Sequence, residues 1–125
     1  MKNQNTLHIF ENGQFINLTT FHKSGVAVST PVWFVKQGQS LYVWTARNSG
    51  KVKRLLNNPR VQLAPSNFRG KPKGPVEDGA AHLVPQSEHA ALEKAFKAKY
   101  GMQYRLFSSI GSSQEHVYVE IRLGD

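Results

Sequence analysis

The sequence predicts a mainly β (α+β) fold in which about six antiparallel strands close into a small barrel, with two short helices inserted late. Segments rich in β-branched and aromatic residues follow one another, and short polar turns separate them. Strands that are adjacent in sequence and joined by short turns pair antiparallel, and closing the sheet removes its exposed edges. Two segments, 50–57 and 87–100, instead show the spacing and end signals of helices.

The first half of the chain contains three strands in sequence order. They are expected at residues 15–21, 26–35 and 41–45, and the turns HKSG and KQGQ separate them. In the third strand Leu41 and Val43 face one side of the sheet, whereas Tyr42 and Trp44 face the other. This alternation predicts an antiparallel meander with one face buried in the core.

The second half adds three strands to the two helices. These strands are expected at residues 60–65, 77–85 and 116–123. Gly79, followed by two alanines, indicates close backbone approach or a bend in the fifth strand. Ser87 is the expected N-cap of the second helix, and Gly101 is placed to end it. In the last strand, HVYVEIRL, the aliphatic side chains share one face.

Composition limits the classes of protein to which the chain can belong. Its 125 residues fit one domain, 1–125, and 16 Lys and Arg against 8 Asp and Glu leave a formal charge of +8, which favours anionic partners. Without cysteine there is no disulfide framework, thiolate metal site or cysteine nucleophile. No apolar run is long enough for a signal peptide or a membrane span, so we expect a cytoplasmic protein without membrane association.

The first predicted helix carries positive charges at the end where helices favour negative ones. Ser49 is its expected N-cap, and Lys51, Lys53 and Arg54 crowd the first turn. Unpaired backbone N–H groups and the positive end of the helix dipole lie there, so each cation costs a few tenths of a kcal/mol to about 1 kcal/mol. A bound phosphate would neutralise these charges, and Thr45 adds a hydroxyl nearby. A solvated basic helix face is the alternative.

Two tryptophans and a proline lie on the neighbouring second and third strands. Pro31 cannot donate to a β ladder, so its strand is an edge, a bulge, or a place where neighbouring backbone is free. Free amides beside Trp33 and Trp44 suit a flat heteroaromatic ligand, whose edges need hydrogen bonds and whose faces need apolar walls. Taken alone, the tryptophans are better explained by packing in the core or at a subunit interface.

The histidines and serines do not occur in the patterns typical of metal sites or hydrolase active sites. The five histidines lack metal-ligand spacing, and no serine has the context of a hydrolase nucleophile. We therefore predict no metal site and no catalytic residue, and we expect a cofactor to perform the chemistry if the protein is an enzyme. The basic loop RGKPKGP, residues 69–75, is either an exposed solubilising loop or a dock for an anionic tail or nucleic acid.

Taken in order, the segments STPVWFV, LYVWT, SGKVKRLLNNPRVQLAP, RGKPKGP and GAAHLV are similar to one group of proteins. The sequence resembles the pyridoxamine-phosphate-oxidase-like superfamily of flavin and deazaflavin oxidoreductases, and more narrowly a short branch of F420-dependent enzymes. The resemblance covers residues 14–86 and a compatible last strand. Since the sequence ends at Asp125, just after that strand, we do not expect the extended segment with which pyridoxamine-phosphate oxidases engage vitamin B6.

The resemblance implies a split β-barrel homodimer that binds F420, or alternatively FMN, in a groove between subunits. In such proteins the lysine that matches Lys51 contacts the cofactor phosphate, and the segment that matches residues 29–33 lines the ring largely through its backbone. The cofactor-binding residues implied for this chain are Ser29, Thr30, Pro31, Val32, Trp33, Trp44, Thr45, Ser49, Gly50, Lys51, Lys53 and Arg54.

The expected function is that of an oxidoreductase that transfers hydride between a flavin-type ring and a small conjugated or heteroaromatic substrate. The protein would supply orientation, a walled ring site and an anchored phosphate. One alternative is a carrier that binds and sequesters the cofactor without turnover. Another is a basic β-barrel that stacks nucleic-acid bases on Trp33, Trp44 and Tyr42. As partners we expect a small-molecule substrate and a second copy of the chain, rather than nucleic acid.

Overall fold

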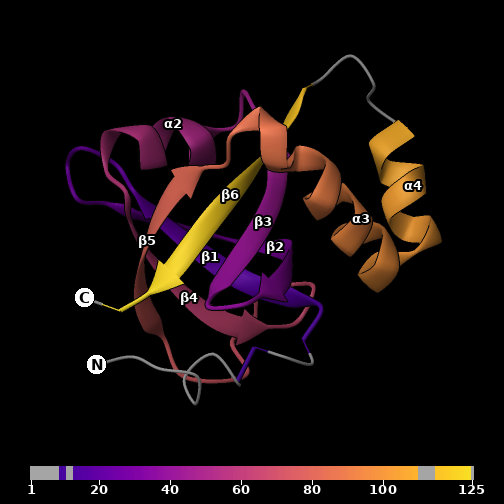
Figure 1. The fold of residues 1–125 in the computed structure, drawn as a ribbon. Coiled ribbons are helices and arrows are strands. Elements are labelled where there is room, and N and C mark those ends of the chain that lie inside the picture. Colours follow the sequence, from indigo (N-terminus) through magenta and orange to yellow (C-terminus); the bar gives the residue numbers. More distant parts are fainter. Residues whose placement is uncertain (1–8, 11–12, 110–114, 125) are drawn as a thin grey trace.

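The computed structural model describes residues 9–10, 13–109 and 115–124, and the strands in this part of the chain form a closed barrel (Figure 1). Around the barrel the strand order is β1-β2-β3-β6-β5-β4, and every neighbouring pair is antiparallel. The predicted mainly β barrel is confirmed, and the strands lie close to their predicted bounds. They are β1 (Phe15–Phe21), β2 (Ala27–Gln37), β3 (Ser40–Ala46), β4 (Arg60–Ser66), β5 (Glu77–Leu83) and β6 (His116–Leu123).

The core is filled by the inward faces of the strands. In β3, Leu41 and Val43 are completely buried, whereas Trp44 faces outward, so the predicted alternation is confirmed. Phe34 is also completely buried, pairs with Val43 and packs edge-on against Phe10 with ring centroids 6.4 Å apart. A slip of one residue would turn this set of side chains toward solvent, so burial of the core fixes the register of the strands.

Gly79 allows β5 and β6 to approach closely, as its sequence context predicted. A Cβ at this position would lie 2.8 Å from the carbonyl oxygen of Arg122 and 3.3 Å from a methyl carbon of Ile121. Real Cβ atoms do not approach backbone so closely, so any larger residue here would push the two strands apart.

The helices lie outside the barrel. They are α2 (Gly50–Asn57), the 3₁₀ turn η1 (Gln86–Glu88), α3 (His89–Tyr100) and α4 (Met102–Ser109). Figure 1 shows α2 across one end of the barrel, with α3 and α4 together at its side. In the described part of the chain, no helix has the length and apolar character that crossing a bilayer requires.

The second predicted helix begins differently from the expectation. Ser87 is not its N-cap, because it lies inside η1, and the residue that caps α3 is Glu88, which makes no side-chain capping bond. The Glu88 N–H donates to the carbonyl oxygen of Pro85 at 3.0 Å, and Pro85 has a φ of −58°. Proline holds φ near this value, so the turn starts before Ser87 and the serine cannot cap the helix.

Helix α4 was not predicted, so the expectation of two helices is incomplete. Gly101, with φ +60°, ends α3 as expected, but the chain then enters α4. Tyr104 of α4 is buried against Phe96, and its hydroxyl lies 2.7 Å from that of Tyr118 on β6. Contacts with α3 and β6 therefore hold this helix in place. The predicted polar stretch 108–115 falls largely outside the described residues.

Lys99 joins α3 to β2 from a half-buried position. Its ammonium donates to the Phe34 carbonyl oxygen at 2.8 Å and lies 3.7 Å from the centroid of the Phe34 ring. The hydroxyl of Tyr100 donates to the carbonyl oxygen of Gln14 and lies 2.9 Å from the same Phe34 oxygen. Burial lowers the pKa of Lys99 to about 8. The ammonium is thus held in contact with the core, at a cost in solvation.

A Lys99→Met variant should change how stability depends on pH. Folded Lys99 loses its proton near pH 8, whereas the unfolded chain keeps it up to the ordinary lysine pKa of 10.5. Between these values the unfolded state binds more protons, so this lysine makes the free energy of unfolding rise with pH. Denaturant unfolding at several pH values should therefore show the parent gaining stability relative to Lys99→Met above about pH 8. A constant difference between the two proteins would contradict this interpretation.

Candidate functional site

Strands β2 and β3 pair over a short distance and then separate. Residues 34–37 of β2 pair with residues 40–43 of β3, whereas β1 follows β2 from Trp33 back to Ala27. Within the described ranges, the part of β2 that contains Pro31 therefore has a strand neighbour on one side only. Beyond Val43, β3 continues in register with β6. The open side matches the expectation for a strand that carries a proline.

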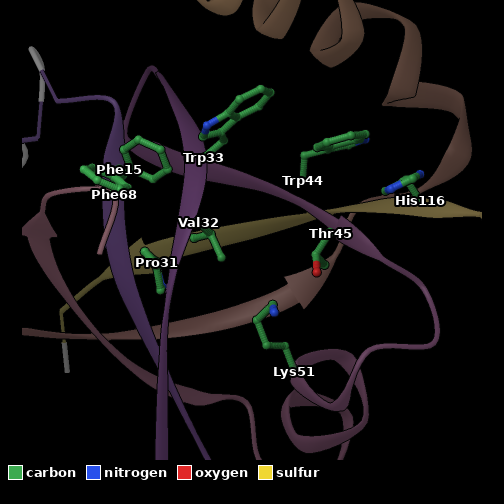
Figure 2. Close-up of a pocket in the computed structure, with 9 residues that line it drawn as sticks. All are labelled: Phe15, Pro31, Val32, Trp33, Trp44, Thr45, Lys51, Phe68 and His116. Carbon is green, nitrogen blue, oxygen red and sulfur yellow. The ribbon is translucent and has the colours of Figure 1, made fainter. Parts of the chain in front are cut away.

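A pocket of about 570 Å³ lies where β2 and β3 separate (Figure 2). We call it the aromatic pocket. Its size suits a small molecule or cofactor. Six of its lining residues, contributed by β2, β3 and α2, belong to the predicted set: Pro31, Val32, Trp33, Trp44, Thr45 and Lys51. The remaining lining residues are Phe15, Phe68 and His116.

The two tryptophans form a row of stacked rings along the pocket. Trp33 and Trp44 lie 6.2 Å apart with 21° between their planes. Trp33 also stacks on Tyr100 of α3 at 4.4 Å, and Trp44 stacks on His116 at 4.2 Å. The tryptophans therefore pack against the helices and β6 while they line the pocket, so packing and wall formation coexist. Contacts on both sides hold each tryptophan ring in a fixed position along the wall of the pocket.

Polar groups gather at the end of the pocket near α2. Ser49 caps the helix as predicted, since its hydroxyl accepts from the Val52 N–H at 3.3 Å, and it lies 3.5 Å from the hydroxyl of buried Thr45. Figure 2 shows Lys51 extending from α2 toward Thr45. Burial, and next the charge of Arg54, lower the pKa of Lys51, and the first turn of α2 contains no acidic residue. The free protein thus holds this cation in an unfavourable place.

The other cations of the helix face a different hollow. Gly50, Lys53 and Arg54 line a space next to the turn between β1 and β2, and none of them lines the aromatic pocket. The Arg54 Nε donates to the buried Thr20 hydroxyl at 2.6 Å. The structure therefore brings Lys51 together with Thr45 and Ser49 but does not gather all three cations around one point.

Three predicted residues, Ser29, Thr30 and Ser49, line neither space. The hydroxyl of Ser29 lies 2.5 Å from that of Thr19 on β1. The hydroxyl oxygen of Thr30 is buried and has no hydrogen-bond partner among the described residues. Leaving a buried hydroxyl unpaired costs about 1–3 kcal/mol.

Sequence reasoning missed three residues that line the pocket. Phe15 pairs with Trp33 across the first hairpin, so the strand register could have identified it. His116 opens the last strand, where nothing in the sequence places it beside Trp44. Phe68 directly precedes the basic loop and is 64% exposed. A bond from Asn17 to the carbonyl oxygen of Gly70 holds this loop near β1, a contact between residues far apart in sequence.

The set of groups in the pocket fits a flavin-type cofactor. Apolar aromatic walls suit a ring system, and the Lys51 ammonium beside the Thr45 hydroxyl suits a phosphate. The described residues contain no cluster of three or more His, Cys, Asp or Glu that could hold a metal ion. The residues that line the aromatic pocket include no carboxylate that would repel an anionic ligand.

Comparisons with known proteins identify relatives. The profile of the family described as pyridoxamine 5'-phosphate oxidase matches residues 4–122. No protein with a curated description matches the chain. Similar solved structures include HutZ, the heme storage protein of Vibrio cholerae, at 12% identity and a TM-score of 0.74, covering 98% of this chain and 90% of that one.

Two other solved structures are similar over nearly the whole chain. A FAD-binding protein of Mesorhizobium loti has 14% identity and a TM-score of 0.69, covering 100% of this chain and 90% of that one. An F420 reductase has 18% identity and a TM-score of 0.68, covering 94% and 92%. Similarity at these identities establishes a shared fold, which is common to a heme storage protein, a FAD-binding protein and an F420 reductase.

Proposed function

The chain belongs to the pyridoxamine 5'-phosphate oxidase family, and we propose that it binds a flavin-type cofactor, F420 or FMN, in the aromatic pocket. It would transfer hydride between this cofactor and a small conjugated or heteroaromatic substrate. The observation that carries the proposal is the position of Lys51, a half-buried cation at the polar end of a pocket walled by Trp33 and Trp44.

Lys51 and the hydroxyls of Thr45 and Ser49 would hold the cofactor phosphate. A hydrogen bond to a charged group contributes about 1.5–3 kcal/mol, and an anion here would also relieve the unfavourable position of the cation. The backbone of residues 31–33 and the ring of Trp44 would hold the flat ring system. When bound, the ring supplies the hydride chemistry, and the protein orients it.

The family resemblance and the open side of the aromatic pocket support a homodimer as part of this proposal. The pocket is open to solvent between β2 and β3, and the exposed residues at its opening include Phe68. A second copy of the chain packed over this side would cover apolar surface and exclude water from the ring. Analytical ultracentrifugation of the protein with and without FMN measures the oligomeric state directly.

Titration with FMN, F420 and riboflavin tests the binding site. Riboflavin shares the FMN ring but lacks the phosphate. We expect FMN to bind about 10- to 100-fold more tightly than riboflavin, since the contacts to phosphate contribute about 1.5–3 kcal/mol. Flavin fluorescence follows the binding. Equal affinities for FMN and riboflavin would contradict the assignment of the phosphate to Lys51.

Turnover separates an oxidoreductase from a carrier of the same cofactor. The reduced cofactor is bound to the protein without oxygen, and small conjugated acceptors are then added. We expect the protein to accelerate reoxidation of the cofactor by at least one such acceptor. If the cofactor binds tightly and is never reoxidised faster than in free solution, the proposed hydride transfer is wrong.

A further inference from the structure

We propose that a second anion-binding site, which takes a phosphate or diphosphate group, lies between α2 and the turn that joins β1 to β2. This hollow has a volume of about 540 Å³. We call it the basic hollow. It is separate from the aromatic pocket, because the two share no lining residue. The residues that line it are Phe21, His22, Lys23, Ser24, Gly50, Lys53, Arg54 and Asn57.

The charge of the basic hollow is strongly positive. Lys23, Lys53 and Arg54 line it, and its described lining contains no acidic residue. None of these three cations forms an ion pair with an acidic side chain in the part of the chain that the structure describes. Like charges close together repel one another, so a bound anion would stabilise the arrangement.

Arg54 is the fixed group of the site. Its Nε donates to the Thr20 hydroxyl, which is completely buried in the barrel, and this bond orients the guanidinium. A Cβ added to Gly50 would come within 2.7 Å of Arg54 Nη1, so the guanidinium folds against the first residue of its own helix. Arg54 also lines the hollow, and with Nε engaged its two terminal nitrogens are the donors left for an anion there.

The turn between β1 and β2 supplies the other side of the hollow. The His22 N–H donates to the Val26 carbonyl oxygen, and the Gly25 N–H donates to the His22 carbonyl oxygen, both at 2.9 Å. Gly25 has φ +93°, a conformation that favours glycine. This turn places Lys23 and Ser24 across the hollow from the helix. Cations from two elements therefore converge, which a simple solvated helix face would not do.

The chemistry of these groups selects an oxyanion with more than one negative charge. A single carboxylate would neutralise only one of the three positive charges. A phosphate or diphosphate carries more negative charge and more acceptor oxygens, so it matches the three cations and the serine hydroxyl better. Such a group could belong to a separate phosphorylated molecule or to the second anionic part of a cofactor longer than FMN. The inference does not depend on the proposed function, which needs only the phosphate at Lys51.

Calorimetric titration of the full chain with inorganic pyrophosphate at constant ionic strength tests the proposal. We expect two binding sites in the parent protein. Lys51→Ala should keep the site in the basic hollow, whereas the double variant Lys23→Ala and Lys53→Ala should weaken that site by about tenfold or more. Both lysines are exposed, so their removal leaves the barrel intact. The double variant Lys94→Ala and Lys97→Ala, at exposed lysines of α3, controls for the loss of two positive charges.

Backbone amide signals in an NMR titration locate the bound pyrophosphate. We expect shifts at residues 22–25 and at Gly50 in the Lys51→Ala variant. Arg54→Lys keeps the charge but loses the fork of donors, so it should weaken this binding while the fold persists. The proposal is wrong if pyrophosphate binds at one site that Lys51→Ala abolishes, or if the control at Lys94 and Lys97 weakens binding as much as the variant at Lys23 and Lys53 does.

Competition identifies the source of the anion. Displacement of pyrophosphate from the turn residues by FAD, but not by FMN, would support the second phosphate of a longer cofactor. If neither FAD nor FMN displaces pyrophosphate from the turn residues, the natural ligand of the basic hollow is a separate phosphorylated molecule. If FMN and F420 fail to bind at all, the proposed function falls, but the pyrophosphate measurements still decide whether the basic hollow is an anion site.

Discussion

Replacing Lys51 by alanine is expected to weaken the binding of FMN by about 10- to 100-fold. The side chain is half-buried and lines the aromatic pocket beside Thr45, and the helix that carries it has no acidic residue in its first turn. A phosphate at this position would gain a charge-assisted hydrogen bond and remove the cost of holding an unpaired cation there. Fluorescence titration of the parent and the variant at the same ionic strength measures the difference.

Lys53→Ala is the matched control, since it removes the same charge from the same helix but from a side chain that lines the basic hollow. It should leave FMN affinity nearly unchanged. Because burial and the charge of Arg54 lower the pKa of Lys51, this ammonium loses its proton at a lower pH than an ordinary lysine. FMN affinity should therefore fall in alkaline solution for the parent but not for Lys51→Ala. Equal losses in both alanine variants would contradict the assignment.

Replacing Phe34 by alanine is expected to lower the free energy of unfolding by about 3–5 kcal/mol. The ring is completely buried, packs against Phe10 and lies beneath the ammonium of Lys99. Its loss leaves a cavity in the barrel where the β2–β3 ladder ends and the two strands separate. Since small proteins are stable by about 5–15 kcal/mol, much of the total would be lost. Urea denaturation followed by far-UV circular dichroism measures the change.

Phe68→Ala removes the same side chain from an exposed loop. Phe68 is 64% exposed, so we expect its removal to change the free energy of unfolding by no more than about 0.5 kcal/mol. It also lines the aromatic pocket, and the same variant therefore reports whether this ring contacts a ligand. Similar destabilisation by the two variants would show that the core is not centred on Phe34.

Much of the fold could be predicted because local sequence patterns and burial agree. Period-two alternation identified the inward face of β3, and the serine and proline flanking α2 marked its bounds. Helix α4 could not be predicted in this way, because what holds it is the packing of Tyr104 on Phe96 of α3 and on Tyr118 of β6, which local patterns do not reveal. Ser87 failed as a cap because Pro85 starts a 3₁₀ turn earlier.

The candidate site was predictable where its residues follow one another along the chain. Residues 31–33, Trp44, Thr45 and Lys51 come from consecutive elements, and the structure places them around one pocket. The sequence could not tell that neighbouring cations of α2 diverge, because the bond between Arg54 and Thr20 depends on how the helix crosses β1. Nor could it place His116, which reaches the pocket only because β6 pairs with β3.

A crystal structure of the protein with saturating FMN tests the central claim most directly. We predict that the ring lies between the separated parts of β2 and β3, beside Trp33 and Trp44. The phosphate oxygens should lie within hydrogen-bond distance of the Lys51 ammonium and the Ser49 hydroxyl. A phosphate bound instead to Arg54 in the basic hollow, with the aromatic pocket empty, would contradict the account.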